Sequence, residues 1–325
     1  MQPIEAIELD AIREARERIA DLVMRTPLIP LNVEDADAEI HVKLENLHPI
    51  GSFKLRGAGN AMLLAGPEAL AAGVYTASAG NMAQGVGWVA NRLGVPFQVI
   101  CPDHAPQTKL EAIERLGGGT IKLPFDEWWE VVENHHYPGL DGQFIHPVSD
   151  PRVIAGNGTI GLEILEDLPD VDAVIVPFGG GGLVSGIASA IRVLKPDTRV
   201  YACEVETAAP LAPSLAAGRP CEVAYTASFV DGIGGKVVLP DMWALVRELI
   251  DASFVSSPEA IAAAIKLLVE RNRVVAEGAG AASVAAALAG VGVEGKVVCV
   301  VSGGNIDTDK LAKILEGGVP ESLQP

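Results

Sequence analysis

The fold class can be predicted from one stretch, Val171-Asp-Ala-Val-Ile-Val-Pro-Phe-Gly-Gly-Gly-Gly-Leu-Val-Ser185. Its apolar first half is typical of a parallel strand that is buried on both faces. The four glycines come where such a strand ends, and helical spacing of apolar residues runs from Leu183 to Leu194. A strand, a glycine turn and a helix in this order predict one unit of a parallel α/β sheet.

The same alternation extends along the chain in both directions. Apolar runs predict further strands at 40–44, 74–77, 97–101, 200–203 and 297–301. Helical spacing predicts helices at 9–25, 82–93, 258–272 and 281–288. Strands and helices that alternate over the whole length predict an α/β fold with parallel sheets. An irregular aromatic stretch, 125–137, precedes a domain boundary that we expect near His146-Pro147.

Composition excludes several classes of function. With 325 residues and 49% hydrophobic content, the chain can bury a large core and is not disordered. The net charge of −18 argues against a nucleic-acid partner. The four cysteines lie far apart without a CxxC pair, so neither a disulfide framework nor a zinc site is indicated. Because no signal-peptide or membrane-spanning pattern is present, we expect a cytoplasmic protein.

The glycines Gly179–Gly182 predict an anion site. Their backbone N–H groups can turn toward one point, and the helix that follows adds the positive end of its dipole, so a phosphate is the expected ligand. A dinucleotide fold is the rival interpretation, but the spacing does not satisfy GxGxxG, since Val184 or Ser185 occupies the third position. A merely flexible turn remains the plain alternative.

Lys54 is a candidate nucleophile. It follows Phe53 and lies two residues after Ser52, between a Pro-Ile-Gly turn and an expected helix. A lysine that packs against an aromatic ring and is partly desolvated has a lowered pKa, which suits an amine that forms a Schiff base. On its own this signal is weak, because most lysines are solvated surface groups.

Two further turns can bind a ligand. Ser78-Ala-Gly-Asn81 joins a strand to a helix and offers donors for a carboxylate, although an ordinary helix cap would look the same. Ser302-Gly-Gly-Asn305 follows the last strand, where the Ser302 hydroxyl can either face a ligand or sit in a turn. The segment 290–296 imitates a P-loop, but Val297 replaces the required Ser or Thr, so we interpret it as a loop.

In order and spacing, Ser52-Phe-Lys54, Ser78-Ala-Gly-Asn81, Gly179-Gly-Gly-Gly-Leu183 and Ser302-Gly-Gly-Asn305 resemble the motifs of fold type II pyridoxal-phosphate enzymes. The nearest branch is the threonine/serine dehydratases, with serine racemase as close kin. The likeness covers residues 25–307, including Ile145-His-Pro147. It implies a tryptophan synthase beta-like fold with pyridoxal 5'-phosphate in a cleft between two domains. We expect a large domain of residues 1–45 plus 146–325 and a small domain of residues 46–145.

The resemblance also implies roles for single residues. Lys54 would bind the cofactor covalently as an imine and later take the Cα proton, Phe53 would pack against the pyridine ring, and Ser302 would meet the pyridine nitrogen. The phosphate would lie on Gly179, Gly180, Gly181, Gly182 and Leu183. Asn81 would bond the 3′-oxygen. The substrate would be surrounded by Ser52, Ser78, Ala79, Gly80, Asn81, Met82 and Val148.

The implied reaction is an ammonia-lyase reaction, in which a β-hydroxy amino acid becomes a 2-keto acid and ammonia. Racemases carry a serine where this chain has Ala79, so elimination is favoured over racemisation. Relatives often have His at Met82 and Phe at Val148. If both positions face the substrate, a bulkier, phenylserine-like substrate follows as a hypothesis. Glu206 matches the first acid of a cation site, but Ala212 replaces the second, so we expect no metal.

Other functions remain as alternatives. A β-replacement enzyme usually has a Thr-rich asparagine turn, which is absent at Ser78–Asn81. A racemase of the same fold is the next alternative. A non-catalytic amino-acid-binding protein would not need the imine-forming Lys54, and a dehydrogenase is opposed by the glycine spacing. Enzymes of the family usually pair their subunits, so we expect a homodimer or homotetramer.

Overall fold

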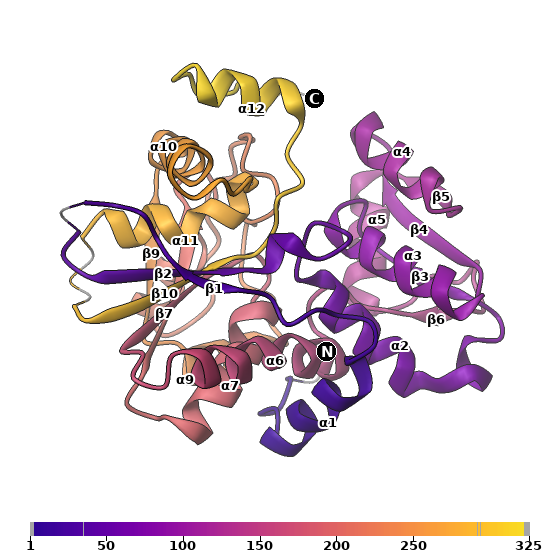
Figure 1. Cartoon of the computed structure of the whole chain (residues 1–325). Helices are drawn as coiled ribbons and strands as arrows, with labels where there is room; N and C mark the ends of the chain where they lie inside the picture. Colours follow the sequence, from indigo (N-terminus) through magenta and orange to yellow (C-terminus); the bar gives the residue numbers. More distant parts are fainter. Residues whose placement is uncertain (1–2, 35, 291, 293, 322–325) are drawn as a thin grey trace.

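Two parallel β-sheets, each covered by helices, organise the chain (Figure 1). The structure is a computed structural model and describes residues 3–34, 36–290, 292 and 294–321. The larger sheet has the strand order β1 (Leu28–Pro30), β2 (Glu39–Leu44), β10 (Lys296–Val301), β7 (Ala173–Pro177), β8 (Arg199–Val205), β9 (Ala252–Ser256). All its pairs are parallel except β1 with β2. The prediction of an α/β fold with parallel sheets is confirmed.

The smaller sheet is wholly parallel and takes its strands from residues 74–144. Its order is β5 (Gly119–Leu123), β4 (Phe97–Pro102), β3 (Val74–Thr76), β6 (Gln143–Phe144). The strands of the larger sheet come from residues before 45 and after 172. The expected domain boundaries after residues 45 and 145 stay a prediction.

The helices are α1 (Leu9–Ile19), α2 (Lys54–Leu70), α3 (Asn81–Leu93), α4 (Gln107–Arg115), α5 (Phe125–Asn134), α6 (Pro151–Asp167), α7 (Gly182–Leu194), α8 (Leu211–Ala217), α9 (Trp243–Leu249), α10 (Pro258–Leu267), α11 (Gly278–Leu288) and α12 (Thr308–Leu315). Short turns of 3₁₀ helix, Glu45–Leu47, and π-helix, Leu268–Asn272, complete them. Among the described residues, no helix combines the length and the apolar character that crossing a membrane requires.

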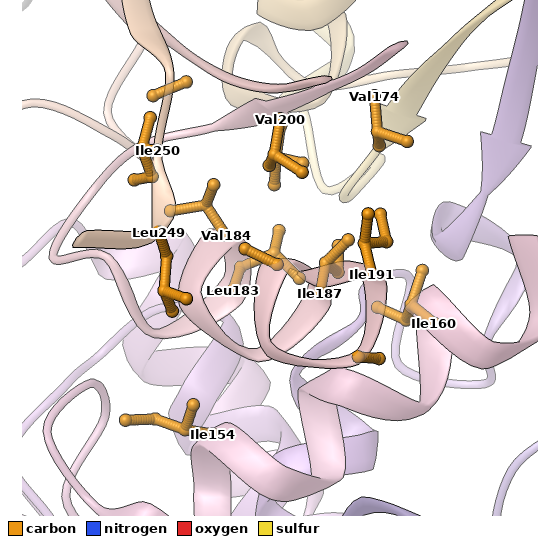
Figure 2. Close-up of a cluster of buried hydrophobic side chains, with 14 of the residues drawn as sticks. Ile154, Ile160, Val174, Leu183, Val184, Ile187, Ile191, Val200, Leu249 and Ile250 are labelled. Carbon is orange, nitrogen blue, oxygen red and sulfur yellow. The ribbon is translucent and has the colours of Figure 1, made fainter. Parts of the chain in front are cut away.

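Apolar clusters fill both faces of the larger sheet. Figure 1 shows α10 and α11 on one face and α6, α7 and α9 on the other. In Figure 2, Ile187 and Ile191 of α7 point toward Val174 of β7 and Val200 of β8. This packing fixes the first turn of α7 at the end of β7, which places the glycine loop.

Close helix crossings position α2 and α7 against α6. A Cβ atom on Gly186 of α7 would lie 2.4 Å from the carbonyl oxygen of Ile154. A Cβ atom on Gly156 of α6 would lie 2.5 Å from the carbonyl oxygen of Arg56 on α2. Glycine therefore allows α2, which begins at Lys54, and α7, which begins at the glycine loop, to pack on one helix.

Four elements differ from the sequence-based expectations. The stretch 125–137, which we expected to be irregular, contains the helix α5, Phe125–Asn134. The first helix ends at Ile19, not at Arg25, and the expected helix 258–272 changes into a single π-helical turn at Leu268. The strand at 40–44 is polar at alternate positions, yet it is buried on both faces, because apolar layers cover both faces of the larger sheet and Lys43 pairs with Glu163 of α6. Part of the dismissed P-loop segment, 290–296, lies outside the described residues.

Candidate active site

The ligand-binding turns come together at the carboxyl ends of parallel strands. Ser78–Asn81 follows β3, Gly179–Gly182 follows β7, and Ser302–Asn305 follows β10. The last turn contacts the first turn and the lysine motif, because the Asn305 side-chain amide donates to the Asn81 side-chain oxygen at 2.8 Å, and Ser52 forms a β-bridge with Gly303. Crevices at such strand ends are the usual ligand sites of α/β sheets.

Lys54 is the first residue of α2, and its amine is placed by surrounding backbone. The Phe53 N–H donates to the Ser302 carbonyl oxygen at 3.0 Å, which fixes where α2 begins. The Lys54 Nζ atom donates to the Pro147 carbonyl oxygen at 2.6 Å and lies 5.1 Å from the centre of the Phe53 ring. Burial lowers the pKa of this amine to about 8. At pH 7 about a tenth of the amine is therefore unprotonated, far more than for an ordinary lysine, and the unprotonated form is the one a nucleophile requires.

The glycine loop has the geometry of an anion cradle. Gly181 has φ 98° and caps α7, a conformation that side chains other than glycine rarely adopt. A Cβ atom on Gly180 would lie 2.5 Å from Val148 Cγ1. Within the described ranges, the N–H groups of Gly179–Gly181 donate to no protein acceptor. These free donors and the dipole of the 13-residue α7 can bind a phosphate.

Asn81 begins α3 and is held at both ends of its amide. Its Nδ2 atom donates to Glu277 Oε1 at 2.8 Å, while its Oδ1 atom accepts from Asn305. Gly80 is the N-cap residue of α3, and its N–H lies 3.4 Å from Ser78 Oγ. The amide orientation is thereby fixed, and its second N–H remains available to a ligand.

The sequence analysis did not identify Glu277. Its carboxyl group is buried beside Asn81, and burial, followed by the nearby Asp231 carboxylate, raises the pKa of Glu277 to about 7. The available signal was a single acid directly before the uncharged, Ala- and Gly-rich run that starts at Gly278. That signal does not reveal the partner, because Asn81 lies 196 positions away.

Ser52 and Ser302 supply hydroxyl groups beside the amine. Ser52 is fully buried, and its Oγ atom has no hydrogen-bond partner in the part of the chain that the structure describes. Ser302 is 3% exposed and directly precedes the bridge to Ser52. A buried hydroxyl without a partner is costly, so a ligand that supplies one is expected here.

The two positions behind the bulky-substrate hypothesis do not form an open pocket. Met82 is 1% exposed and belongs to the hydrophobic core between α2, α3 and the smaller sheet. Val148 packs against Gly180 and the core of the larger sheet. Ala79, by contrast, stays half-buried in the turn beside Asn81. The structure therefore does not support an enlarged apolar pocket.

The acid that matches the cation-site pattern, Glu206, and the nearby Glu204 differ in burial. Glu206 is exposed, whereas Glu204 at the end of β8 is buried. Its carboxylate accepts from the N–H groups of Leu211 and Ala212 at 2.7 and 2.9 Å and from the Ser253 hydroxyl at 2.7 Å. These donors occupy the carboxylate oxygens that a cation would need. Among the described residues, no three His, Cys, Asp or Glu side chains are grouped as metal ligands.

Arg56, the other basic residue of the lysine motif, belongs to a buried ionic network. Its guanidinium group donates to Glu45 at 2.7 and 2.9 Å and to Glu163 at 2.7 and 2.9 Å. Lys43 adds a contact of 2.6 Å to Glu163. Because both carboxylates are engaged by Arg56, its charge is balanced internally and does not serve the anion sites.

Comparisons with known proteins agree with this geometry. Residues 19–303 match the family model described as pyridoxal-phosphate dependent enzyme. The chain is 41% identical over 321 residues to an L-threonine ammonia-lyase of Thermotoga maritima, covering 97% of this chain and 80% of that protein. It is 38% identical to the catabolic L-threonine dehydratase of Escherichia coli K12, covering 95% and 96%. The structure of maize serine racemase superposes with a TM-score of 0.88 at 34% identity, covering 96% and 98%.

Proposed function

The chain belongs to the pyridoxal-phosphate dependent enzymes, and from this membership we propose that it is an L-threonine ammonia-lyase. The observation that carries the proposal is the half-buried Lys54 amine, whose pKa burial lowers to about 8, linked through Pro147 and Val148 to a glycine loop whose N–H groups have no partner among the described residues. The relatives named as threonine ammonia-lyase and threonine dehydratase support threonine as the substrate. The proposed products are a 2-keto acid and ammonia.

The residues present fit pyridoxal 5'-phosphate. Gly179–Gly181 offer backbone donors for the phosphate, and the Lys54 amine can bind the aldehyde carbon. The Ser52 hydroxyl lacks a partner among the described residues, which a bound ligand would relieve. When bound, the cofactor supplies an electron sink that stabilises negative charge at the substrate Cα.

Lys54 is the base in this proposal. Its pKa near 8 lies close to the working pH, where a group can both take up and release a proton. Burial alone lowers this pKa, and the Pro147 carbonyl oxygen gives the free amine a fixed resting position at 2.6 Å. Lys54 would remove the Cα proton and hold it at Nζ.

The Ser78–Asn81 turn would bind the substrate carboxylate. The N-terminus of the 13-residue α3 and the Ser78 hydroxyl are donors that need no formal positive charge. The Ser302 hydroxyl would face the pyridine nitrogen, where a neutral group does not keep the ring protonated. This weaker electron withdrawal favours prompt loss of the β-hydroxyl over a long-lived carbanion.

Ala79 favours elimination over racemisation. Its methyl group occupies the turn where racemases of this fold carry a serine, and it has no proton to give to the opposite face of Cα. The likeness to maize serine racemase supports the shared scaffold, while this position separates the two reactions. We therefore expect ammonia release without appreciable formation of D-amino acid.

A keto-acid assay tests the proposal. The purified protein, loaded with pyridoxal 5'-phosphate, is given threonine, serine, 3-hydroxyaspartate and phenylserine, and the keto acid is measured together with ammonia. Threonine should have the highest kcat/KM, and Lys54→Ala should abolish turnover and the absorption band that borohydride bleaches. A wild-type protein without that band, or with no keto acid from threonine, would refute the proposal.

A further inference from the structure

The connection between β6 and α6, residues 145–150, touches the site at two points. The Pro147 carbonyl oxygen accepts the hydrogen bond of the Lys54 amine at 2.6 Å. The Val148 side chain lies against Gly180, and its carbonyl oxygen would be 2.8 Å from a Cβ atom on Gly182. The conformation of this connection therefore determines the position of the free amine and the shape of the glycine loop.

The imidazole of His146 holds the connection in place. Its Nδ1 atom accepts from the Ser149 N–H at 2.7 Å and from the Val148 N–H at 3.1 Å. Because an accepting Nδ1 atom carries no hydrogen, the ring proton is on Nε2, which donates to the Val132 carbonyl oxygen at 3.2 Å. Pro147 has no N–H, so the next two residues supply the donors that need a partner in this buried turn.

The surroundings keep His146 neutral. The residue is 2% exposed, and its ring stacks on His135 with a centroid distance of 4.2 Å. Ser149 Oγ lies 3.1 Å from Nδ1, and Asp241 faces His135 at 3.6 Å. Burial, together with the positive charges that His135 and Lys54 can carry, lowers the pKa of His146 to about 3. The Nδ1 lone pair is therefore available throughout the neutral range.

We propose that His146 is a positioning residue, whose Nδ1 lone pair orients Pro147–Ser149 so that one carbonyl group holds the Lys54 amine and one side chain supports the glycine loop. The role of the amine rests on the proposed function. His146 does not contact the reacting atoms in this arrangement, since it acts through Pro147 and Val148. Removing the lone pair should disturb cofactor binding more than substrate binding, because the Ser78–Asn81 turn lies on a different element.

Two substitutions distinguish the contribution of the Nδ1 lone pair from that of the ring shape. His146→Phe retains the ring shape and the stacking on His135 but removes the acceptor, whereas His146→Asn restores an acceptor oxygen. The matched control is His136→Phe, since His136 is exposed and lies two residues past the end of α5, the helix that carries Val132. Cofactor-free protein is titrated with pyridoxal 5'-phosphate, with circular dichroism of the bound-cofactor band as the readout, and kcat and KM for threonine are then measured.

The expected pattern is specific. His146→Phe should weaken cofactor affinity and lower kcat by about tenfold each, less than the roughly hundredfold that a full one-ångström misplacement can cost, with KM for threonine within about threefold of wild type. His146→Asn and His136→Phe should stay within about threefold of wild type in all three quantities, since each leaves an acceptor beside the turn. Wild-type values for His146→Phe, or equal losses for His146→Phe and His146→Asn, would overturn the proposal.

Nitrogen NMR of the wild-type imidazole gives a test that does not depend on how variants fold. We expect His146 Nδ1 to be unprotonated and its shift to be constant from about pH 6 to 8, well above its lowered pKa. A protonated Nδ1, or a titration in that range, would contradict the assignment. Failure of the wild-type protein to convert threonine would refute the proposed function only, because cofactor affinity and the imidazole tautomer are measured without substrate.

Discussion

Replacing Arg56 with methionine should destabilise the cofactor-free protein by about 3–5 kcal/mol, the usual cost of removing one partner from a buried ion pair. Arg56 is 1% exposed, and its guanidinium group bonds both oxygens of Glu45 and both oxygens of Glu163. Methionine keeps much of the side-chain volume but leaves two buried carboxylates with fewer donors. Lys43 and His48 remain as partners, so the loss is partial for each acid.

The expected change in melting temperature follows from chain length. An unfolding entropy of about 2.1 cal/mol/K per residue corresponds to about 0.7 kcal/mol/K for 325 residues, so the shift is about 4–7 °C. The Arg56 charge is the largest of the influences that lower the pKa of Glu45 in the folded protein. A carboxyl group whose pKa is lowered on folding stabilises the fold at pH values above its ordinary pKa. This stabilisation is lost as the pH falls through the lowered pKa. The difference in melting temperature between the wild type and Arg56→Met should therefore become smaller below about pH 4.

Differential scanning calorimetry of the cofactor-free proteins measures this shift. The matched control is Arg13→Met, because Arg13 pairs with Asp10 at 3.1 Å on the surface, with half of its side chain exposed. That substitution should lower the melting temperature by about 1 °C or less. Arg56→Lys should give an intermediate loss, since an ammonium group cannot bond two carboxylates in the same fork. An Arg56→Met shift no larger than the Arg13→Met shift would refute the reasoning.

Three other expectations follow from the site. Gly180→Ala should lower cofactor affinity by about tenfold or more in a titration, because its Cβ atom would lie 2.5 Å from Val148 Cγ1; unchanged affinity would contradict the packing of the loop. Glu277→Gln should flatten the loss of melting temperature between about pH 5 and 8 in cofactor-free protein, because a raised carboxyl pKa, about 7, stabilises the fold at low pH and stops doing so as the pH rises through it. If the two proteins lose stability in parallel, Glu277 does not titrate there. Met82→Leu should leave the ranking of threonine over phenylserine in kcat/KM unchanged, since Met82 is core; a reversal would return this position to the substrate pocket.

Sequence reasoning proposes site residues where the chemistry is local. The glycine loop and the Ser78–Asn81 turn could be predicted because they follow apolar strands, and parallel strands bring their carboxyl ends to one edge. Lys54 had only a weak local signal, and the family resemblance identified it. The fold class followed from periodicity, whereas the helix end at Ile19 and the π-helical turn at Leu268 depend on tertiary packing that periodicity does not contain.

The contacts that tune the site were beyond local reasoning. Glu277 meets Asn81 across 196 positions, and the tautomer of the His146 ring depends on the carbonyl group of Val132 on α5, a helix that ends before His146. Met82 shows the same limit from the other side: its motif position predicts a substrate contact, which stays a prediction, while its side chain packs into the core. Spacing identifies which residues are near a turn, but the side-chain direction depends on the neighbouring helix.

The way in which this acidic chain would bind anions affects the pKa of the Lys54 amine. In the proposed function a protein with a net charge of −18 holds a phosphate and a carboxylate. The N–H groups at Gly179–Gly181, which have no partner among the described residues, and the N-terminus of α3 can do so with dipoles. Arg56, the nearest arginine in the motif, is neutralised by Glu45 and Glu163. An unpaired arginine in the cleft would bind the same anions, but its charge would lower the pKa of Lys54 further, and a weaker base would result. Dipoles bind the anions without that cost, which leaves burial as the cause that sets the pKa of Lys54 near 8.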